Sequence, residues 1–274
     1  MRYGLYLAFA ALWWISVSFA SFTEREAEVM GPRNKQLYIA FVFAGAPRSL
    51  VVPVVHESIR VNLVQALCPA PICVAHVYAR ISRADNTHKP NDAVGDTTRV
   101  ESSVVDEAVL RSLERIAGGN KVFAEYAETG SAEEKKEMVD HANALNASSK
   151  LRHDIYRAFD PRRYSMHFLR DRAFRFMTRH EQKATQGGQY DWVVHVRMDM
   201  GWSEPVSQPI FSFDENHIYV PSMWFADTPD TFALVPRRLA DTYFGIDGLI
   251  IPPRVMCIGG PNFDPTTASL KGMV

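Results

Sequence analysis

The chain has 274 residues, of which 47% are hydrophobic and 22% are charged, with 15 glycines and 16 prolines. This ordinary globular composition excludes a disordered, fibrous or multi-span membrane protein. Thirty Lys and Arg against 31 Asp and Glu give a formal charge of −1. No basic excess exists to neutralise a phosphate backbone, so we expect no nucleic acid partner. Three cysteines are too few for a disulfide scaffold or a thiolate zinc site.

An apolar segment opens the chain, because no charged residue occurs from Tyr3 to Ala20. A helix of that length rises roughly 27 Å, close to the thickness of the hydrocarbon core of a bilayer. Small residues at Ser18 and Ala20 also fit the cleavage site of a secretory signal. The sequence therefore predicts three parts: a signal anchor or signal peptide over 1–22, a short stem over 23–35, and an α/β domain over 36–274. We expect this domain to be attached to the ER or Golgi membrane, or to be lumenal or secreted if the signal is cleaved.

A β-α-β unit follows the stem. Residues 36–44 are a continuous apolar run, typical of a strand buried on both faces of a parallel sheet. Apolar residues at near-helical spacing predict a helix over 53–67, and 72–81 has the pattern of a second buried strand. This order implies a parallel sheet with a right-handed crossover. Cys68 and Cys73 lie between helix and strand, either as buried thiols or as a disulfide.

The rest of the chain continues the alternation of helices and strands. Residues 82–96 are polar and predict a loop. The apolar patterns predict helices over 103–116, 131–144, 164–182 and 236–243, and strands over 192–200, 217–220 and 231–235. We expect a single α/β domain with a mostly parallel central sheet flanked by helices.

Ligands of open α/β sheets bind beyond the carboxyl ends of the strands, and the end of the first strand carries a suggestive turn. Its sequence is Gly45-Ala46-Pro47-Arg48-Ser49. The glycine permits a tight turn, and Arg48 is a candidate for contact with an anionic group. The simpler interpretation is a strand-to-helix turn with a solvated arginine.

The strand predicted over 192–200 carries His195, Arg197 and Asp199, which period-2 alternation places on one face. Ionisable groups on an apolar strand are costly to bury unless they pair with each other or with a ligand. Asp199, nearest the carboxyl end, is placed to hold a divalent cation that phosphate oxygens complete. Alternatively, Arg197 and Asp199 form a structural ion pair.

A third strand end contains Asp227 and Asp230, on either side of a proline just before residues 231–235. They are candidates for acceptor binding or for a general base. Aspartate and proline are also common in turns that have no catalytic role.

Three blocks of the chain resemble a eukaryotic glycosyltransferase-like family. They are FVFAGAPRS over 41–49, YDWVVHVRMD over 190–199 and DTFALVPR over 230–237. The family is similar to nucleotide-sugar-dependent enzymes of the GT-A fold that typically follow a signal anchor. The resemblance spans roughly residues 35–244. It implies a single GT-A-like domain, a nucleotide-sugar donor, and a glycan or glycoprotein acceptor.

The resemblance also implies roles for individual residues. A short acidic motif after a central strand holds Mn²⁺ or Mg²⁺ in such enzymes, and Asp199 matches it. The usual Asp-x-Asp is Arg197-Met198-Asp199 here, so a cation replaces the first carboxylate. For a glycosyltransferase we assign donor binding to Gly45, Arg48, Ser49 and Arg197, and catalysis to Asp227 and Asp230.

Two alternatives to a glycosyltransferase stay open. The turn that follows the first strand resembles the phosphosulfate-binding loop of sulfotransferases, where helix amides bind phosphate. Arg197, in place of a carboxylate, favours a lumenal binding module on a degenerate transferase scaffold.

Overall fold

The computed structural model describes residues 36–47, 49–82, 102–127, 161–221, 232–245 and 255–258, and the single positions 132, 136, 139 and 140. The predicted signal segment and stem, residues 83–96 of the predicted loop and most of the helix predicted over 131–144 lie outside these residues. Ser82, predicted to begin the loop, is instead the last residue of a strand. Within the described ranges, no helix is long and apolar enough to cross a membrane.

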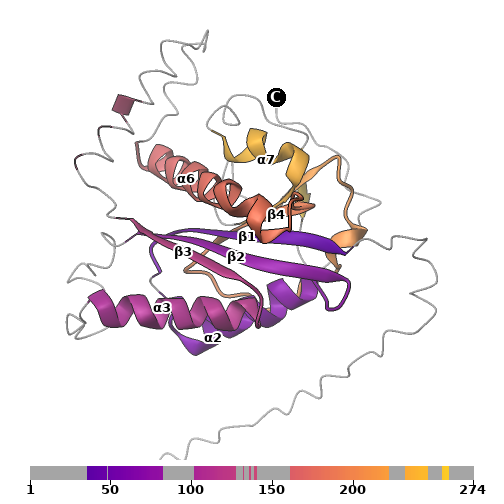
Figure 1. Cartoon of the computed structure of the whole chain (residues 1–274), viewed down its shortest axis with the longest axis horizontal. Coiled ribbons are helices and arrows are strands. Elements are labelled where there is room, and N and C mark those ends of the chain that lie inside the picture. Colours follow the sequence, from indigo (N-terminus) through magenta and orange to yellow (C-terminus); the bar gives the residue numbers. More distant parts are fainter. Residues whose placement is uncertain are drawn as a thin grey trace, which may run out of the picture. The chain divides into compact units, whose positions relative to one another are not determined.

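The described strands form one seven-stranded sheet in the order β3-β2-β1-β4-β6-β5-β7 (Figure 1). Among the described strands, only β6 runs antiparallel to its neighbours β4 and β5, and the other pairings are parallel. The mostly parallel sheet is thereby confirmed. The strands are β1 (Leu37–Gly45), β2 (Cys73–Ser82), β3 (Val122–Ala127), β4 (Trp192–Arg197), β5 (Ile218–Pro221), β6 (Phe232–Pro236) and β7 (Val255–Ile258).

Helices cover both faces of the sheet (Figure 1), which confirms the predicted α/β class. On one face lie α2 (Pro53–Ser58), its π-helical continuation η1 (Ile59–Gln65) and α3 (Ser102–Ala117). On the other lie α6 (Pro161–Ala184) and α7 (Arg237–Phe244). Each layer has its own core: Leu63, Leu113 and Val194 belong to the first, and Met177 and Phe244 to the second. Strands apolar on both faces, such as β1, are what two such layers require.

Two strands were not predicted, and one predicted strand ends early. β3 lies at an edge of the sheet, and five of its six residues are only partly buried, so it lacks the continuous apolar pattern of β1. β7 has only four residues. The strand predicted over 192–200 ends at Arg197, and Met198 and Asp199 form a turn.

A buried polar network lies between the sheet and α6. The Tyr190 hydroxyl is 2.8 Å from Nδ1 of His76 and 2.7 Å from the Tyr78 hydroxyl, and the Tyr190 amide donates to Glu181 (3.0 Å). Burial lowers the pKa of His76 to about 4 and raises the pKa of Tyr78 to about 12. His76 is therefore neutral at physiological pH, and the network contains no buried imidazolium.

The depressed pKa of His76 predicts a loss of stability in mild acid. Between pH 6.5 and 4 the unfolded chain protonates this histidine while the folded chain does not, so the free energy of unfolding falls as the pH falls. The full effect is on the order of 3 kcal/mol. Urea unfolding at pH 7, 6 and 5 should show a smaller decline for His76→Gln than for the wild type. Parallel curves for the two proteins would contradict the assignment.

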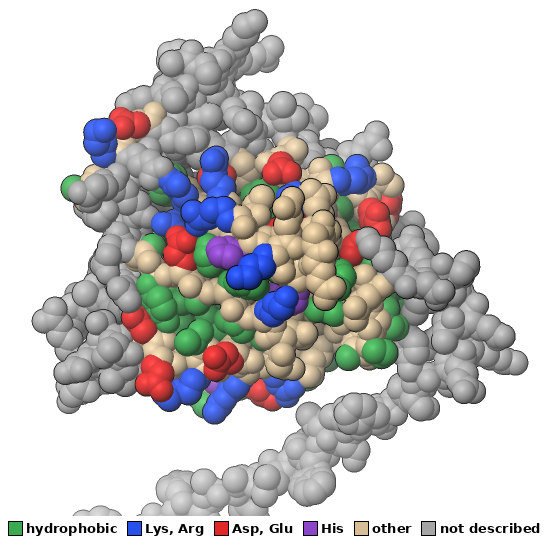
Figure 2. All heavy atoms as spheres, in the orientation of Figure 1, with side chains coloured by type: hydrophobic (Ala, Val, Ile, Leu, Met, Phe, Trp, Pro, Cys, Tyr) green, Lys and Arg blue, Asp and Glu red, His purple; other side chains and the backbone are tan. Residues whose placement is uncertain are grey.

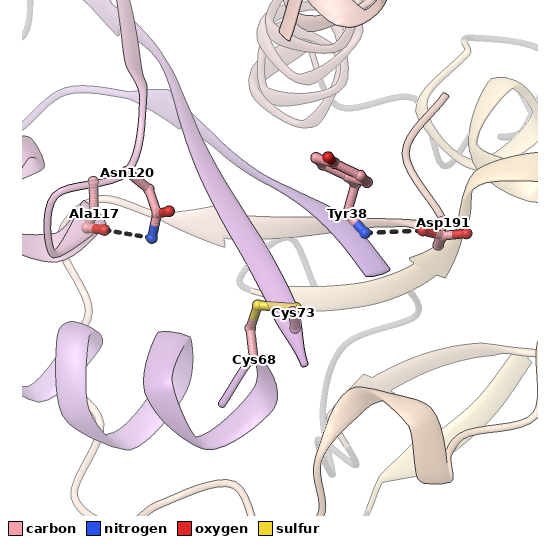
Figure 3. Close-up of a disulfide and its surroundings, with 6 residues drawn as sticks. All are labelled: Tyr38, Cys68, Cys73, Ala117, Asn120 and Asp191. Carbon is pink, nitrogen blue, oxygen red and sulfur yellow. Dashed lines mark hydrogen bonds between the residues drawn. A yellow bond between two sulfur atoms is a disulfide. The ribbon is translucent and has the colours of Figure 1, made fainter. Parts of the chain in front are cut away.

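An ion pair extends the network to α7. Arg237 donates from Nε and Nη2 to the two carboxylate oxygens of Glu181, at 2.7 and 2.9 Å, and both residues are buried. The Arg237 amide donates to the carbonyl oxygen of Asp191 (3.0 Å). The Tyr38 amide donates to Oδ2 of Asp191 at 2.8 Å (Figure 3). The Asp191 amide donates in return to the carbonyl oxygen of Tyr38, also at 2.8 Å. The amino ends of β1, β4 and α7 are thus tied together.

Arg237→Met should destabilise the protein by about 3–5 kcal/mol, because it leaves the buried Glu181 carboxylate without its counter-charge. The double variant Arg237→Met/Glu181→Met should lose less free energy of unfolding than the two single variants lose together, since no charge is then left unpaired. Urea unfolding of the four proteins in a double-mutant cycle measures this. Additive losses would show that the two side chains do not interact.

Cys68 and Cys73 form a disulfide, with their Cα atoms 5.2 Å apart (Figure 3). It joins the chain just beyond the helical segment of α2 and η1 to the first residue of β2. Of the two alternatives that the sequence left open, the structure has the disulfide. The bond lies at the amino end of β2.

Candidate functional site

The carboxyl ends of β1 and β4 meet at the point where the strand order reverses. Strands β3, β2 and β1 succeed one another on one side, and β4 lies on the other side of β1. Both pairings of β1 are parallel, with Gly45 opposite Ile81 and Ala44 opposite Arg197. Open α/β sheets bind ligands outside the carboxyl ends of their strands at such a reversal. This edge is therefore the candidate site.

The turn that follows β1 begins at Gly45, whose φ of 114° lies in the region that favours glycine. Leu50 and Val52 donate their amides to the carbonyl oxygens of Pro47 and Ser49, at 2.6 and 2.9 Å, and Pro53 then starts α2. The chain thereby turns sharply from the sheet edge into the helix layer. Arg48 lies outside the described residues, so its predicted contact with an anion stays a prediction.

Arg197 and Asp199 form an ion pair at the end of β4. Nε of Arg197 donates to Oδ1 of Asp199 at 2.9 Å, and Nη2 donates to Oδ2 at 2.8 Å. The side chains keep 32% and 16% of their accessible surface. The Ser49 hydroxyl donates to the carbonyl oxygen of Asp199 (3.1 Å). Three of the predicted donor-binding and metal-binding residues are therefore in contact, although 150 positions separate Ser49 from Asp199.

His195 is not part of this group. It is buried, and its ring lies 6.4 Å from Tyr243 and 6.0 Å from Phe244, against α7. The sequence placed it on one face with Arg197 and Asp199. Asp199 instead lies beyond the strand, in a turn that brings its carboxylate back to Arg197.

The described residues do not fit a divalent cation at Asp199. Both carboxylate oxygens accept hydrogen bonds from Arg197, and within the described ranges no group of three or more His, Cys, Asp or Glu is placed to hold a metal ion. Mg²⁺ requires several oxygen ligands in near-octahedral geometry. The metal role of Asp199 stays a prediction from the sequence. Asp227 and Asp230 lie outside the described residues, and their catalytic roles also stay predictions.

Two residues at the same edge were not singled out from the sequence. Ser82, the last residue of β2, is buried, and its hydroxyl has no hydrogen-bond partner among the described residues. Trp202 holds the segment after Asp199, because its amide donates to the Ser58 hydroxyl (3.0 Å) and its ring lies 5.0 Å from that of Phe232. Ser82 could have been identified from the sequence, because it is a polar residue at the end of an apolar strand. Trp202 has no local pattern that would have marked it.

Gly45→Ala should destabilise the protein by about 1–3 kcal/mol. Among the described residues, no heavy atom lies within 4 Å of the point that an alanine Cβ would occupy here, so the expected cost comes from the positive φ. Gly188→Ala is the matched control, because its φ lies outside the positive range and its nearest contacts are ordinary at 3.6–4.0 Å. Urea unfolding of both variants measures the difference. Equal effects would show that the turn does not require glycine.

No family model matches the chain, and no curated protein matches it. The chain is similar to the crystal structure of mouse xyloside xylosyltransferase 1 in its apo form, with 12% sequence identity and a TM-score of 0.35. The match covers 81% of this chain and 85% of the mouse chain. At this identity and score, the similarity carries no conclusion about activity or substrate.

Proposed function

We propose that the protein is a glycosyltransferase that transfers a sugar from a nucleotide-sugar donor to a glycan or glycoprotein acceptor. The observation that carries the proposal is the contact between the turn after β1 and the turn after β4, where Ser49 donates to Asp199. Two of the three blocks that resemble the glycosyltransferase-like family thus meet at the strand-order reversal, where α/β sheets bind ligands.

Transfer of a sugar from a nucleotide donor requires positive charge at the carboxyl ends of β1 and β4. Transfer breaks the bond between the anomeric carbon and the diphosphate oxygen, so negative charge builds on the departing nucleoside diphosphate. Preorganised donors aimed at such charge are often the largest catalytic contribution. Arg197 supplies a guanidinium there, and Gly45 and Ser49 belong to the turn beside it. We assign Arg48, which lies between them in sequence, to the diphosphate as well. In this proposal Asp230, with Asp227 near it in sequence, binds the acceptor or takes the proton from its attacking hydroxyl.

The disulfide supports a secretory-pathway location, and the surface charge argues against a nucleic acid partner. The Cys68–Cys73 disulfide is typical of an oxidising compartment. The signal anchor or signal peptide that the sequence predicts over 1–22 would direct the chain to such a compartment. On the face shown in Figure 2, the acidic and basic side chains of the described residues are interspersed. This distribution is unlike the basic stripe of a nucleic-acid-binding protein.

The turn after β1 does not favour a sulfotransferase. A phosphosulfate-binding loop offers backbone amides to phosphate. Here Leu50 and Val52 already donate their amides within the turn, and position 53 is a proline without an amide hydrogen.

A ligand panel tests the proposal. The full chain is heated with nucleotide sugars, with and without Mn²⁺, and with adenosine phosphosulfate, and donor hydrolysis is measured in parallel. A nucleotide sugar at 100 times its dissociation constant stabilises a protein by about 2.7 kcal/mol. This corresponds to a rise in Tm of roughly 5–10 °C.

The panel also separates the alternatives. Stabilisation by adenosine phosphosulfate alone would identify a sulfotransferase. A folded protein that responds to none of these compounds would be a non-catalytic binding module.

A further inference from the structure

We propose that His56 is a positioning residue for donor binding, which fixes the turn after β1 by tying that turn to α3. The inference rests on the proposed function and deepens it. It starts from a buried histidine that the proposed reaction does not use. His56 lies in the last turn of α2, and only 3% of its surface is accessible.

Both ring nitrogens of His56 have partners, and these partners allow one arrangement of the proton. Nδ1 lies 3.1 Å from the carbonyl oxygen of Leu50, and Nε2 lies 3.4 Å from Nη1 of Arg115. A carbonyl oxygen can only accept a hydrogen bond, and a guanidinium can only donate one. The imidazole therefore carries its proton on Nδ1 and accepts at Nε2. With the proton on Nε2 instead, it would lose both hydrogen bonds.

The three residues come from three parts of the fold. Leu50 belongs to the turn after β1, His56 to α2, and Arg115 to the last turn of α3. Helices α2 and α3 are in contact on one face of the sheet (Figure 1). The His56 ring therefore links a short turn to a helix of 16 residues. This link adds to the hydrogen bonds that the turn makes within itself.

The link acts on the part of the turn that reaches the candidate site. Leu50 is fully buried, and the Ser49 hydroxyl beside it in the chain donates to the carbonyl oxygen of Asp199. A buried carbonyl that loses its partner costs free energy, so the turn would rearrange without His56 and would move Ser49. Binding groups have to be held within about 0.5 Å of their productive positions. His56 thereby acts on donor affinity through the turn.

Nuclear magnetic resonance of the full chain tests the link itself. Long-range proton–nitrogen spectra distinguish the two neutral tautomers of each imidazole, and comparison with His56→Ala identifies the His56 signals. We expect the His56 proton on Nδ1. A proton on Nε2 would overturn the inference, because neither Leu50 nor Arg115 could then be its partner.

Amide hydrogen exchange tests the effect on the turn. His56→Ala should speed exchange of the Leu50 and Val52 amides about 5- to 10-fold and leave the amides of β1 protected. His56→Asn keeps a donor near the place of Nδ1 and should restore protection, whereas His56→Gln places its amide near Nε2 and should not. If His56→Ala does not fold, the contrast between these two variants decides. An equal loss of protection throughout the chain would overturn the inference.

His180→Ala is the matched control. Nδ1 of His180 also lies close to a backbone carbonyl, that of Phe176 at 2.9 Å, but this contact is within α6 on the other face of the sheet. Its loss should leave exchange in the turn unchanged.

Titration with UDP-, GDP- and CMP-linked sugars measures donor binding. His56→Ala should weaken binding of the sugar that binds the wild type by about 2- to 10-fold, and His56→Asn should bind like the wild type. Arg115→Met should have a smaller effect than His56→Ala, because it leaves the hydrogen bond to Leu50 in place.

The outcomes separate this inference from the proposed function. Donor affinity of His56→Ala equal to that of the wild type would overturn the positioning role and leave a glycosyltransferase. A folded wild type that binds none of these sugars would overturn both.

Discussion

The parallel pairing of β1 with β4 is the constraint on which the candidate site depends. It joins residues 37–45 to residues 192–197 and places Ala44 beside Arg197. Strands β2 and β3, which come between β1 and β4 in the chain, lie on the other side of β1. The pairing of β1 with β4 therefore creates the reversal of strand order. Without it, the Gly45 turn and the Arg197–Asp199 pair would belong to separate parts of the molecule.

The two ends of the sheet are built differently. At the amino end, backbone and side-chain bonds tie Tyr38 to Asp191 and Arg237 to Glu181, and the Cys68–Cys73 disulfide lies nearby along β2. Buried polar groups there are paired with one another, which costs least in an apolar interior. At the carboxyl end, Arg197 and Asp199 keep part of their surface exposed. The rigid amino end of the sheet fixes the positions of the side chains at the carboxyl end, and functional groups require such precise placement.

The sequence predicted the elements whose pattern is local. The apolar runs of β1 and β2 and the helical spacing of α3 and α6 identified those elements to within three residues at each end. β3 was missed because an edge strand with a half-exposed surface lacks that signal. The reversed direction of β6 depends on the path of the chain, which no local pattern records.

For the candidate site, too, the sequence predicted only what a local pattern records. Alternation indicated that Arg197 and Asp199 belong together, but it left metal binding and ion pairing as open alternatives. The turn at Met198 settles the geometry, since it brings the Asp199 carboxylate back to the guanidinium. The contact with Ser49 joins positions far apart in the chain and follows only from the folded sheet.

The separation of β1 from β4 in the chain has a consequence for biosynthesis. β1, α2 and β2 are neighbours in sequence and pair locally, whereas β4 follows Gly45 only after about 150 residues of intervening chain. At typical rates of translation, roughly 7–30 s pass before β4 has been synthesised. During that interval one edge of β1, an apolar strand, has no partner, and an unpaired apolar edge is a template for aggregation. In the nascent chain this edge is therefore the part of the sheet most exposed to aggregation until the central strand β4 has been made.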